Sequence, residues 1–388
     1  MNTAERLVQT LEQLQVDTFF GLPGSTEAAL LEALRQSSKI RYVLGLHEGV
    51  VVAMADGYAR ASGRVGVASL HTTVGTMNGL SQLYNSARDA VPVLLTAGHK
   101  DRTVLAEDGF CAIPDLASLA RQFAKYSWQS LSSEQVPADL ARAYAAALTP
   151  PRGAAYLALP EDLLAAPSPE EAAPLPLAGR LEAEGAPDPE LVGELARRLL
   201  SAQRPRLVLG GLAAPASAEA QRLAEAVGMG VLANDLTELS CLSYPTDDSH
   251  YLGVWGEEPA ALEGCDLLLA VGCRVSFPFS ARRRAQLPPG ATLVQIHPDP
   301  AQLARRQATD LGIAGDPGRW LRALARAGAQ LAPGDEGPGR RAAELRELRT
   351  GRLESVAAEL QAVAGAQPLA VADLAQRLAQ VLPEGTIV

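Results

Sequence analysis

Short, continuously apolar runs alternate with amphipathic segments along the first 165 residues, and this alternation restricts the possible folds more than any other feature. The apolar runs cover 16–21, 40–46, 65–70 and 91–98, and the segments between them have helical periodicity. Strands that are apolar on both faces and separated by helices form parallel sheets covered on both sides. We therefore predict a doubly wound parallel-sheet α/β domain over residues 1–165.

The same pattern returns in the middle of the chain. Apolar runs cover 205–211, 229–234, 265–273 and 291–299, and a helix begins after Asp188, a predicted N-cap followed by Pro189. This pattern predicts a second doubly wound α/β domain over residues 188–330. Residues 166–187 are rich in proline and predict an extended linker between the two domains.

Residues 331–388 follow a different pattern. They predict a Gly/Pro loop, two amphipathic helices and the first residues of an apolar strand at Thr386. A parallel strand of two or three residues cannot hold the edge of a sheet. We interpret this segment as a linker and a C-terminal helical stub that opens a third α/β domain missing from the sequence.

Composition excludes several classes of function. The 34 basic and 44 acidic residues give a net charge of -10, which disfavours nucleic acids and anionic membrane surfaces as partners. The four cysteines lie far apart, which excludes a disulfide scaffold and a cysteine zinc site. No apolar run approaches the roughly 18 residues of a membrane span, and no signal peptide opens the chain. We expect a soluble cytoplasmic protein.

Polar residues with catalytic chemistry follow the predicted strands of the first domain. Ser25 lies in GLPGSTE (21–27), Glu48 follows the second strand, and His71 and Asn78 lie in HTTVGTMNG (71–79). In an open parallel sheet, ligands bind at the carboxyl ends of the strands. We therefore expect Ser25, Glu48, His71 and Asn78 to line one rim of the sheet.

Each of these residues also has a structural interpretation. Glu48 precedes an apolar stretch, so it is either a carboxyl group of raised pKa that exchanges a proton with a ligand nitrogen, or an acidic first-turn residue favoured by the helix dipole. His71 is either a satisfied structural histidine or a proton-transfer group. Ser25 lies in a turn composition without the GxSxG elbow, so a hydrolase triad is weakly supported. The Gly-Gly at 210–211 lacks the complete dinucleotide-binding motif.

Four ordered segments, FGLPGSTE, LHEGVVVAMADGYARASGRVGV, SLHTTVGTMNGL and VPVLLTAG, resemble the pyrimidine-binding domain of thiamine diphosphate-dependent enzymes. This family includes acetolactate synthases, pyruvate decarboxylases and benzoylformate decarboxylases. The resemblance covers residues 1–165, and residues 188–330 resemble the family's central α/β domain. It implies thiamine diphosphate and Mg²⁺ as cofactors. The Mg²⁺ ligands are expected in the missing diphosphate-binding domain, whose GDG signature the chain lacks, so no metal ligand is assigned here.

Within the family, SLHTTVGTMN most resembles benzoylformate decarboxylase, which has a histidine at the place of His71 and a serine at the place of Ser25. The resemblance implies that Glu48 hydrogen-bonds N1′ of the aminopyrimidine. It also implies that His71 donates or relays a proton and that Ser25 orients the substrate carboxylate. The residues implied to shape the cofactor pocket are Pro23, Gly24, Gly75 and Asn78.

The implied function is decarboxylation of a 2-keto acid by a homodimer or homotetramer, with acetolactate synthase-like carboligation as the alternative. A different class of function is a non-catalytic remnant, or a partner subunit that supplies the pyrimidine half-site. The chain departs from the benzoylformate branch at Leu22, where that branch has Asn, and at Phe279, which aligns near its second active-site histidine. We expect no bound FAD in the middle domain.

Overall fold

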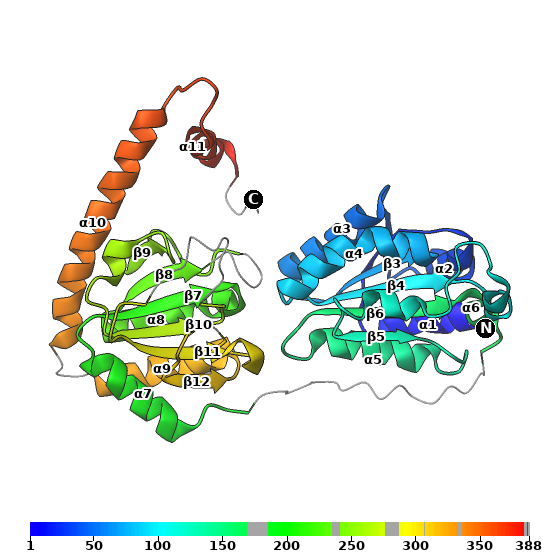
Figure 1. The fold of residues 1–388 in the computed structure, drawn as a ribbon, viewed down its shortest axis with the longest axis horizontal. Coiled ribbons are helices and arrows are strands. Elements are labelled where there is room, and N and C mark those ends of the chain that lie inside the picture. Colours follow the sequence, from blue (N-terminus) through cyan, green and yellow to red (C-terminus); the bar gives the residue numbers. More distant parts are fainter. Residues whose placement is uncertain are drawn as a thin grey trace. The chain divides into compact units, whose positions relative to one another are not determined.

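The computed structural model describes residues 1–168, 185–234, 241–275, 287–305, 307–332, 336–383 and 386. They form two compact units, Met1–Gly185 and Ala186–Val388, each built on one six-stranded sheet (Figure 1). All paired strands run parallel, which confirms the predicted fold class. Most of the predicted linker, Phe279 and the last two residues of the predicted strand at 386–388 lie outside the described residues.

The first unit alternates strands and helices, as its apolar runs predict. Its strands are β1 (Thr18–Leu22), β2 (Arg41–Leu44), β3 (Gly66–His71), β4 (Val93–His99), β5 (Tyr126–Gln129) and β6 (Ala154–Pro160). Its helices are α1 (Thr3–Gln13), α2 (Ala28–Gln36), α3 (Glu48–Ser62), α4 (Thr72–Arg88), α5 (Val136–Leu148) and α6 (Glu161–Ala165). The four predicted strands begin and end within a few residues of β1 to β4, and β5 and β6 complete the sheet.

Local sequence signals set the ends of two helices. The Asn2 side chain accepts a hydrogen bond from the Glu5 N–H, and the Glu5 carboxylate accepts one from the Asn2 N–H, which together form a capping box at the start of α1. Helix α3 ends at Gly63, whose φ of 71° lies in the left-handed region that glycine adopts without steric cost.

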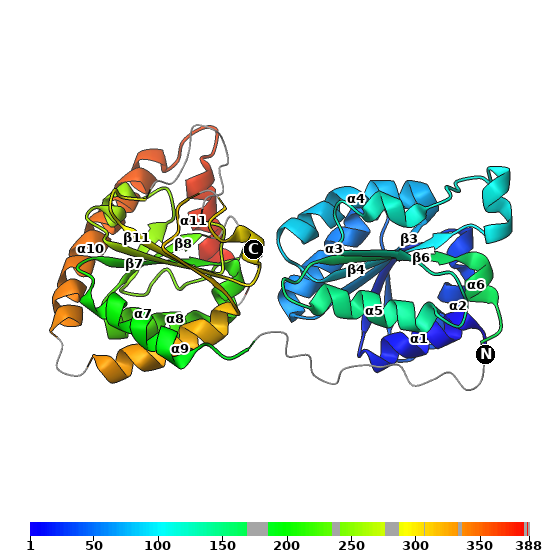
Figure 2. The ribbon, with the colours of Figure 1, turned by 60° about the horizontal axis from the view of Figure 1, so that its bottom comes forward.

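The strand order of the first sheet is β2-β1-β3-β4-β6-β5. From β1 the chain first adds β2 on one side and then crosses over to add β3 on the other side. The direction in which strands are added to the sheet therefore reverses between β1 and β3. Figure 2 shows α3 and α4 over one face of this sheet and α1 and α5 over the other. In doubly wound sheets, a ligand crevice forms at the carboxyl end of such a reversal point. Because helices cover both faces, the central strands of the sheet form the core, and β4 and β6 are buried along their whole length.

The second unit is doubly wound as well, with the strand order β12-β11-β10-β7-β8-β9. Its strands are β7 (Pro205–Gly210), β8 (Gly230–Asn234), β9 (Tyr251–Val254), β10 (Leu267–Val271), β11 (Thr292–His297) and β12 (Leu311–Ala314). Its helices are α7 (Pro189–Ser201), α8 (Ser217–Val227), α9 (Pro317–Leu331), α10 (Gly337–Val363) and α11 (Val371–Val381). Asp188 caps α7 through the Glu190 N–H, as predicted.

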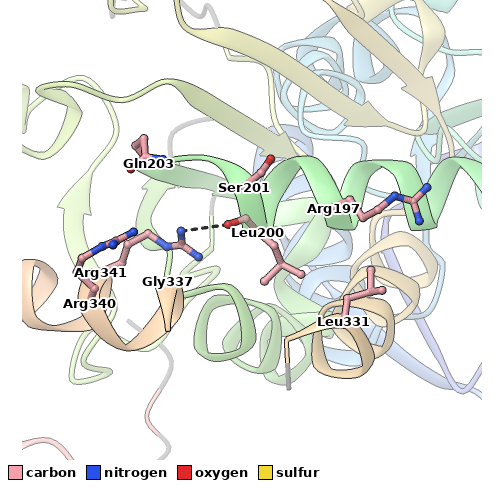
Figure 3. Close-up of a pocket in the computed structure, with 8 residues that line it drawn as sticks. All are labelled: Arg197, Leu200, Ser201, Gln203, Leu331, Gly337, Arg340 and Arg341. Carbon is pink, nitrogen blue, oxygen red and sulfur yellow. Dashed lines mark hydrogen bonds between the residues drawn. The ribbon is translucent and has the colours of Figure 1, made fainter. Parts of the chain in front are cut away.

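Within the second unit, the first turns of α10 pack against the ends of α7 and α8. Arg341, 5% exposed, donates hydrogen bonds to the carbonyls of Leu200, Ala202 and Val227 at the C-terminal ends of α7 and α8. A cation at two helix C-termini is favoured by both helix dipoles. Figure 3 shows the cavity of about 390 Å³ beside this contact, lined in part by Arg197, Arg340 and Arg341. No described helix is both long and apolar enough to cross a membrane.

Candidate active site

Three of the predicted site residues lie at the carboxyl edge of the first sheet. Ser25 follows β1, His71 is the last residue of β3, and Glu48 opens α3 after β2. Because β1 lies between β2 and β3, the loops that carry these residues leave neighbouring strands at the same edge. The fold therefore places them at the reversal point where doubly wound sheets bind ligands.

Glu48 lies at the N-terminus of α3 with one carboxylate oxygen held in place. Its Oε2 accepts a hydrogen bond of 3.1 Å from Asn78 Nδ2 on α4, and no described residue donates to Oε1. Gly75 lies one helical turn before Asn78, and a Cβ built on it would lie 3.7 Å from Oε1. The missing side chain of Gly75 thus leaves room beside a half-buried carboxylate.

His47, rather than Glu48, caps α3. The Nδ1 atom of His47 accepts a hydrogen bond of 3.1 Å from the Gly49 N–H. The Glu48 carboxylate is therefore not needed as a cap, although it still lies at the positive end of the helix dipole. Its hydrogen bond to Asn78 instead directs it toward α4.

His71 is held by a buried carboxylate that the sequence analysis did not single out. Its Nδ1 lies 3.0 Å from Glu27 Oε2 and 3.0 Å from Thr26 Oγ1. The Thr26 hydroxyl donates to Glu27 Oε1 at 2.8 Å, so it accepts from His71. Both contacts require a proton on Nδ1. This tautomer leaves Nε2, which has no partner among the described residues, as the acceptor nitrogen of a ring that is 31% exposed.

Glu27 accepts hydrogen bonds on every side. Besides Thr26 and His71, the backbone N–H groups of Gly24 and Gly98 donate to it, at 2.7 Å and 2.8 Å. The side chain is 2% exposed, and a buried carboxylate of this kind is stable only when its oxygens are satisfied by donors. Glu27 therefore fixes the orientation of His71 and joins the loop after β1 to the end of β4.

Two glycines make this network possible by close approach. A Cβ on Gly24 would lie 2.3 Å from Nδ1 of His71, and a Cβ on Gly98 would lie 2.0 Å from Oε1 of Glu27. Both distances are far shorter than a carbon atom tolerates. Gly24, which the sequence analysis assigned to the cofactor pocket, is thus required by the His71 ring, and Pro23 precedes it in the same turn.

Backbone strain lies next to His71. Thr72, the first residue of α4, has a φ of 48°, a left-handed conformation that is costly for a β-branched residue. Its hydroxyl is buried and has no hydrogen-bond partner among the described residues, and the same holds for the hydroxyl of Ser69 on β3. Strained backbone and unsatisfied buried hydroxyls are features that cluster at ligand sites.

Ser25 is exposed and lies beside a cation. Lys100, which follows β4, donates from its Nζ to Ser25 Oγ at 3.3 Å. No imidazole contact to Ser25 occurs among the described residues, because His71 is bound to Thr26 and Glu27. The arrangement therefore favours a hydroxyl that binds an anion over the activated serine of a hydrolase.

The cavity in Figure 3 belongs to the second unit and contains none of the predicted site residues. In the part of the chain that the structure describes, no group of three or more His, Cys, Asp or Glu side chains could hold a metal ion. At the reversal point of the second sheet, between β7 and β10, a Cβ on Gly210 would lie 2.2 Å from Cβ of Cys273. The end of β7 and the loop after β10 therefore pack directly on each other. The absence of FAD there stays a prediction.

Two family models match this chain. Residues 1–119 match the N-terminal TPP binding domain of the thiamine pyrophosphate enzymes, and residues 192–324 match their central domain. The chain belongs to the thiamine pyrophosphate enzyme family. Thiamine pyrophosphate is thiamine diphosphate, so the resemblance inferred from the sequence motifs is confirmed.

Curated relatives within this family include two kinds of enzyme. A benzoylformate decarboxylase from Pseudomonas aeruginosa is 35% identical over 323 residues, which are 81% of this chain and 60% of that protein. The chloroplastic acetolactate synthase of Arabidopsis thaliana is 30% identical over 322 residues, which are 81% of this chain and 47% of the synthase. The chain thus spans about 60% or less of the length of these two relatives.

Solved structures of thiamine diphosphate enzymes have the same fold. A thiamine diphosphate-dependent 4-hydroxybenzoylformate decarboxylase from Rhodococcus jostii RHA1 matches with a TM-score of 0.78 and 30% identity, covering 87% of this chain and 64% of that one. The benzoylformate decarboxylase of Polynucleobacter necessarius matches with a TM-score of 0.75 and 27% identity, covering 84% of this chain and 61% of that one.

The Glu48 carboxylate at the carboxyl edge of the first sheet suits the aminopyrimidine ring of the family's cofactor. Glu48 Oε1 has no described partner, and a Cβ on Gly75 would lie 3.7 Å from it. Asn78 holds the other oxygen of the carboxylate at 3.1 Å. A carboxylate with one fixed and one open oxygen suits a hydrogen bond to a ring nitrogen. Motif analysis assigned Glu48, Asn78 and Gly75 to the site. It noted Lys100 after the strand at 91–98 without a role and did not single out Glu27, and the contacts of both became apparent only from the tertiary structure.

Proposed function

We propose that this chain supplies the pyrimidine-binding site of a thiamine diphosphate-dependent enzyme that decarboxylates a 2-keto acid. The observation that carries the proposal is the Glu48 carboxylate, with Oε2 held by Asn78 and Oε1 open beside Gly75. When bound, thiamine diphosphate supplies a nucleophilic carbon and an electron sink for the carbon–carbon bond that breaks. The residues that bind the diphosphate and Mg²⁺ are also part of this proposal, and we assign them to a further domain.

Each residue of the site has a stated task in this proposal. Glu48 exchanges a proton with the aminopyrimidine nitrogen, a role of the kind that contributes roughly 10²–10⁴-fold to a rate. Nε2 of His71 exchanges a proton with the carbonyl oxygen of the substrate, while Glu27 holds the ring with a proton on Nδ1. Ser25 hydrogen-bonds the substrate carboxylate. Pro23 and Gly24 shape the turn that brings Ser25 to the rim.

The first experiment measures contact between the cofactor and the chain. Saturation-transfer NMR of thiamine diphosphate with the purified chain should transfer signal to the aminopyrimidine protons, and Glu48→Gln should weaken this transfer strongly. Glu32→Gln is the matched control, because Glu32 lies on α2 with a side chain that is 54% exposed and ion-paired to Arg35. Equal transfer in wild type and Glu48→Gln would remove Glu48 from the cofactor site.

The second experiment separates decarboxylation from its alternatives. The chain is incubated with thiamine diphosphate, Mg²⁺ and either benzoylformate or pyruvate, and carbon dioxide, aldehyde and acetolactate are measured. Carbon dioxide and benzaldehyde from benzoylformate support the decarboxylase, whereas acetolactate from pyruvate supports the carboligase. Because the diphosphate and Mg²⁺ ligands are assigned to a further domain, Glu48-dependent cofactor binding without turnover of either substrate fits a chain that supplies only the pyrimidine half-site, as part of the decarboxylase or as a partner subunit.

Exposed apolar side chains on the helices beside Glu48 support a homo-oligomer. Val50 on α3 is 51% exposed, and Val74 and Met77 on α4 are 48% and 50% exposed. Adjacent apolar side chains at the surface are typical of protein interfaces. We propose a homodimer or homotetramer that buries this face. Sedimentation of the wild type and of Met77→Glu tests it, and an unchanged mass in Met77→Glu would contradict it.

A cytoplasmic location and the assignment of 331–388 to a linker and a third domain stay proposals from the sequence.

A further inference from the structure

Lysine is rare in this chain, and one of its lysines lies at the candidate active site. Of the 34 basic residues only Lys39, Lys100 and Lys125 are lysines. Lys39 is ion-paired with Glu12 at 3.2 Å, and Lys125 donates to two backbone carbonyls. Lys100 instead donates to the Ser25 hydroxyl at 3.3 Å, and among the described residues it forms no ion pair.

The acidic residues next to Lys100 in the chain, and those on α6 that contact residues 101 and 102, bind other groups. Asp101 caps the short 3-10 helix that begins at the next residue. Glu161 accepts a hydrogen bond from the Asp101 N–H at 3.1 Å, and Asp162 is ion-paired with Arg102 at 2.8 Å. None of these carboxylates forms an ion pair with the ammonium group of Lys100. A cation in this position attracts an anion from outside the chain.

The neighbouring groups determine which part of a substrate this cation can reach. Lys100 follows β4 and Ser25 follows β1, and both strands pair with β3, which ends at His71. Thr26, the residue after Ser25, accepts from Nδ1 of His71. The Ser25 hydroxyl can accept from Lys100 and still donate its own proton. The ammonium and the hydroxyl together present two donors at one point of the rim.

We propose that Lys100 and Ser25 form the carboxylate-binding pair of the substrate site, with Lys100 as the residue that makes the site specific for free 2-keto acids. This inference rests on the proposed function. The carboxylate loses its charge as it leaves as carbon dioxide, so its attraction to Lys100 is stronger in the bound substrate than in the transition state. Such an interaction lowers KM and does not raise kcat. Lys100→Gln should therefore raise KM about tenfold, as expected for a charged hydrogen bond, and should not lower kcat.

Binding can be measured in the full chain without turnover. Reductive ¹³C-methylation converts the three lysines to dimethylamines, which keep their charge and cannot form an imine with a keto acid. Benzoylformate should then shift the Lys100 methyl signal saturably, whereas its methyl ester, with the same shape and no charge, should not. The signals of Lys39 and Lys125 should not move. Lys100→Gln assigns the signal, and Lys39→Gln is the matched control for KM.

The outcomes separate this inference from the proposed function. An equal response of Lys100 to acid and ester, or an equal response of Lys39 and Lys100 to the acid, overturns the assignment of Lys100. Turnover whose KM is unchanged in Lys100→Gln overturns it as well, while it leaves the decarboxylase in place. The Lys100 signal can shift with the acid but not with the ester while the aminopyrimidine contact proves independent of Glu48. This pair of results supports the carboxylate site and rejects the cofactor role proposed for Glu48.

Discussion

Replacing Glu27 by glutamine should destabilise the first unit, although the new side chain has nearly the same shape. One position of the carboxylate faces the Gly98 N–H and the Thr26 hydroxyl, and the other faces the Gly24 N–H and His71. A glutamine amide has one oxygen and one NH₂ group. In either orientation the NH₂ group meets a backbone N–H, so one buried donor loses its acceptor.

The size of this effect follows from the burial of the site. A buried donor without an acceptor costs about 1–3 kcal/mol, so the free energy of unfolding of the first unit should fall by that amount. The matched control is Glu32→Gln. The Glu32 side chain is 54% exposed, against 2% for Glu27, and loss of an exposed ion pair should change the free energy by less than about 1 kcal/mol.

Urea-dependent hydrogen exchange read by mass spectrometry is a suitable assay, because the two units need not unfold together. Peptides that contain Gly24 and Gly98 should exchange faster in Glu27→Gln than in wild type. The Glu32→Gln protein should exchange like the wild type. If Glu27→Gln stays within about 0.5 kcal/mol of wild type, a shift of the size usual for surface substitutions, the reasoning that Glu27 is a four-fold acceptor is wrong.

Three further changes test the packing. Gly98→Ala places a Cβ 2.0 Å from Glu27 Oε1 and should lower the melting temperature of the first unit. Gly57 lies inside a helix, and a Cβ there meets no atom within 4 Å, so Gly57→Ala should stabilise the unit by about 0.5–1 kcal/mol. Equal effects of the two substitutions in calorimetry would contradict this. Arg341→Lys loses hydrogen bonds to two helix ends, so the start of α10 should exchange faster, and unchanged exchange would argue against that docking contact. Burial raises the pKa of Cys265 from 9.0 to about 11. Because the folded state keeps its proton longer, stability should fall as the pH rises from about 9 to about 11, and Cys265→Ala should remove this loss.

The elements and the edge of the sheet that carries the site could be predicted from the sequence. Continuous apolar runs placed β1 to β4 close to their observed bounds, and Asp188 marked the start of α7 by its local backbone chemistry. The rim that carries Ser25, Glu48 and His71 followed from one rule, since all strands of a parallel sheet end at the same edge. These features depend on neighbours within a few residues or on the period of the pattern, which a single sequence contains.

Contacts between distant segments depend on which strands become neighbours, and only the tertiary structure decides this. Glu27 is an ordinary acidic residue of a first helical turn until β4 lies beside β3 and brings the Gly98 N–H to its carboxylate, 71 residues away along the chain. Lys100 and Ser25 are 75 residues apart and meet for the same reason. The order of strands in a sheet is set by the packing of helices on both faces, which involves the whole domain and leaves no local pattern near Glu27 or Lys100.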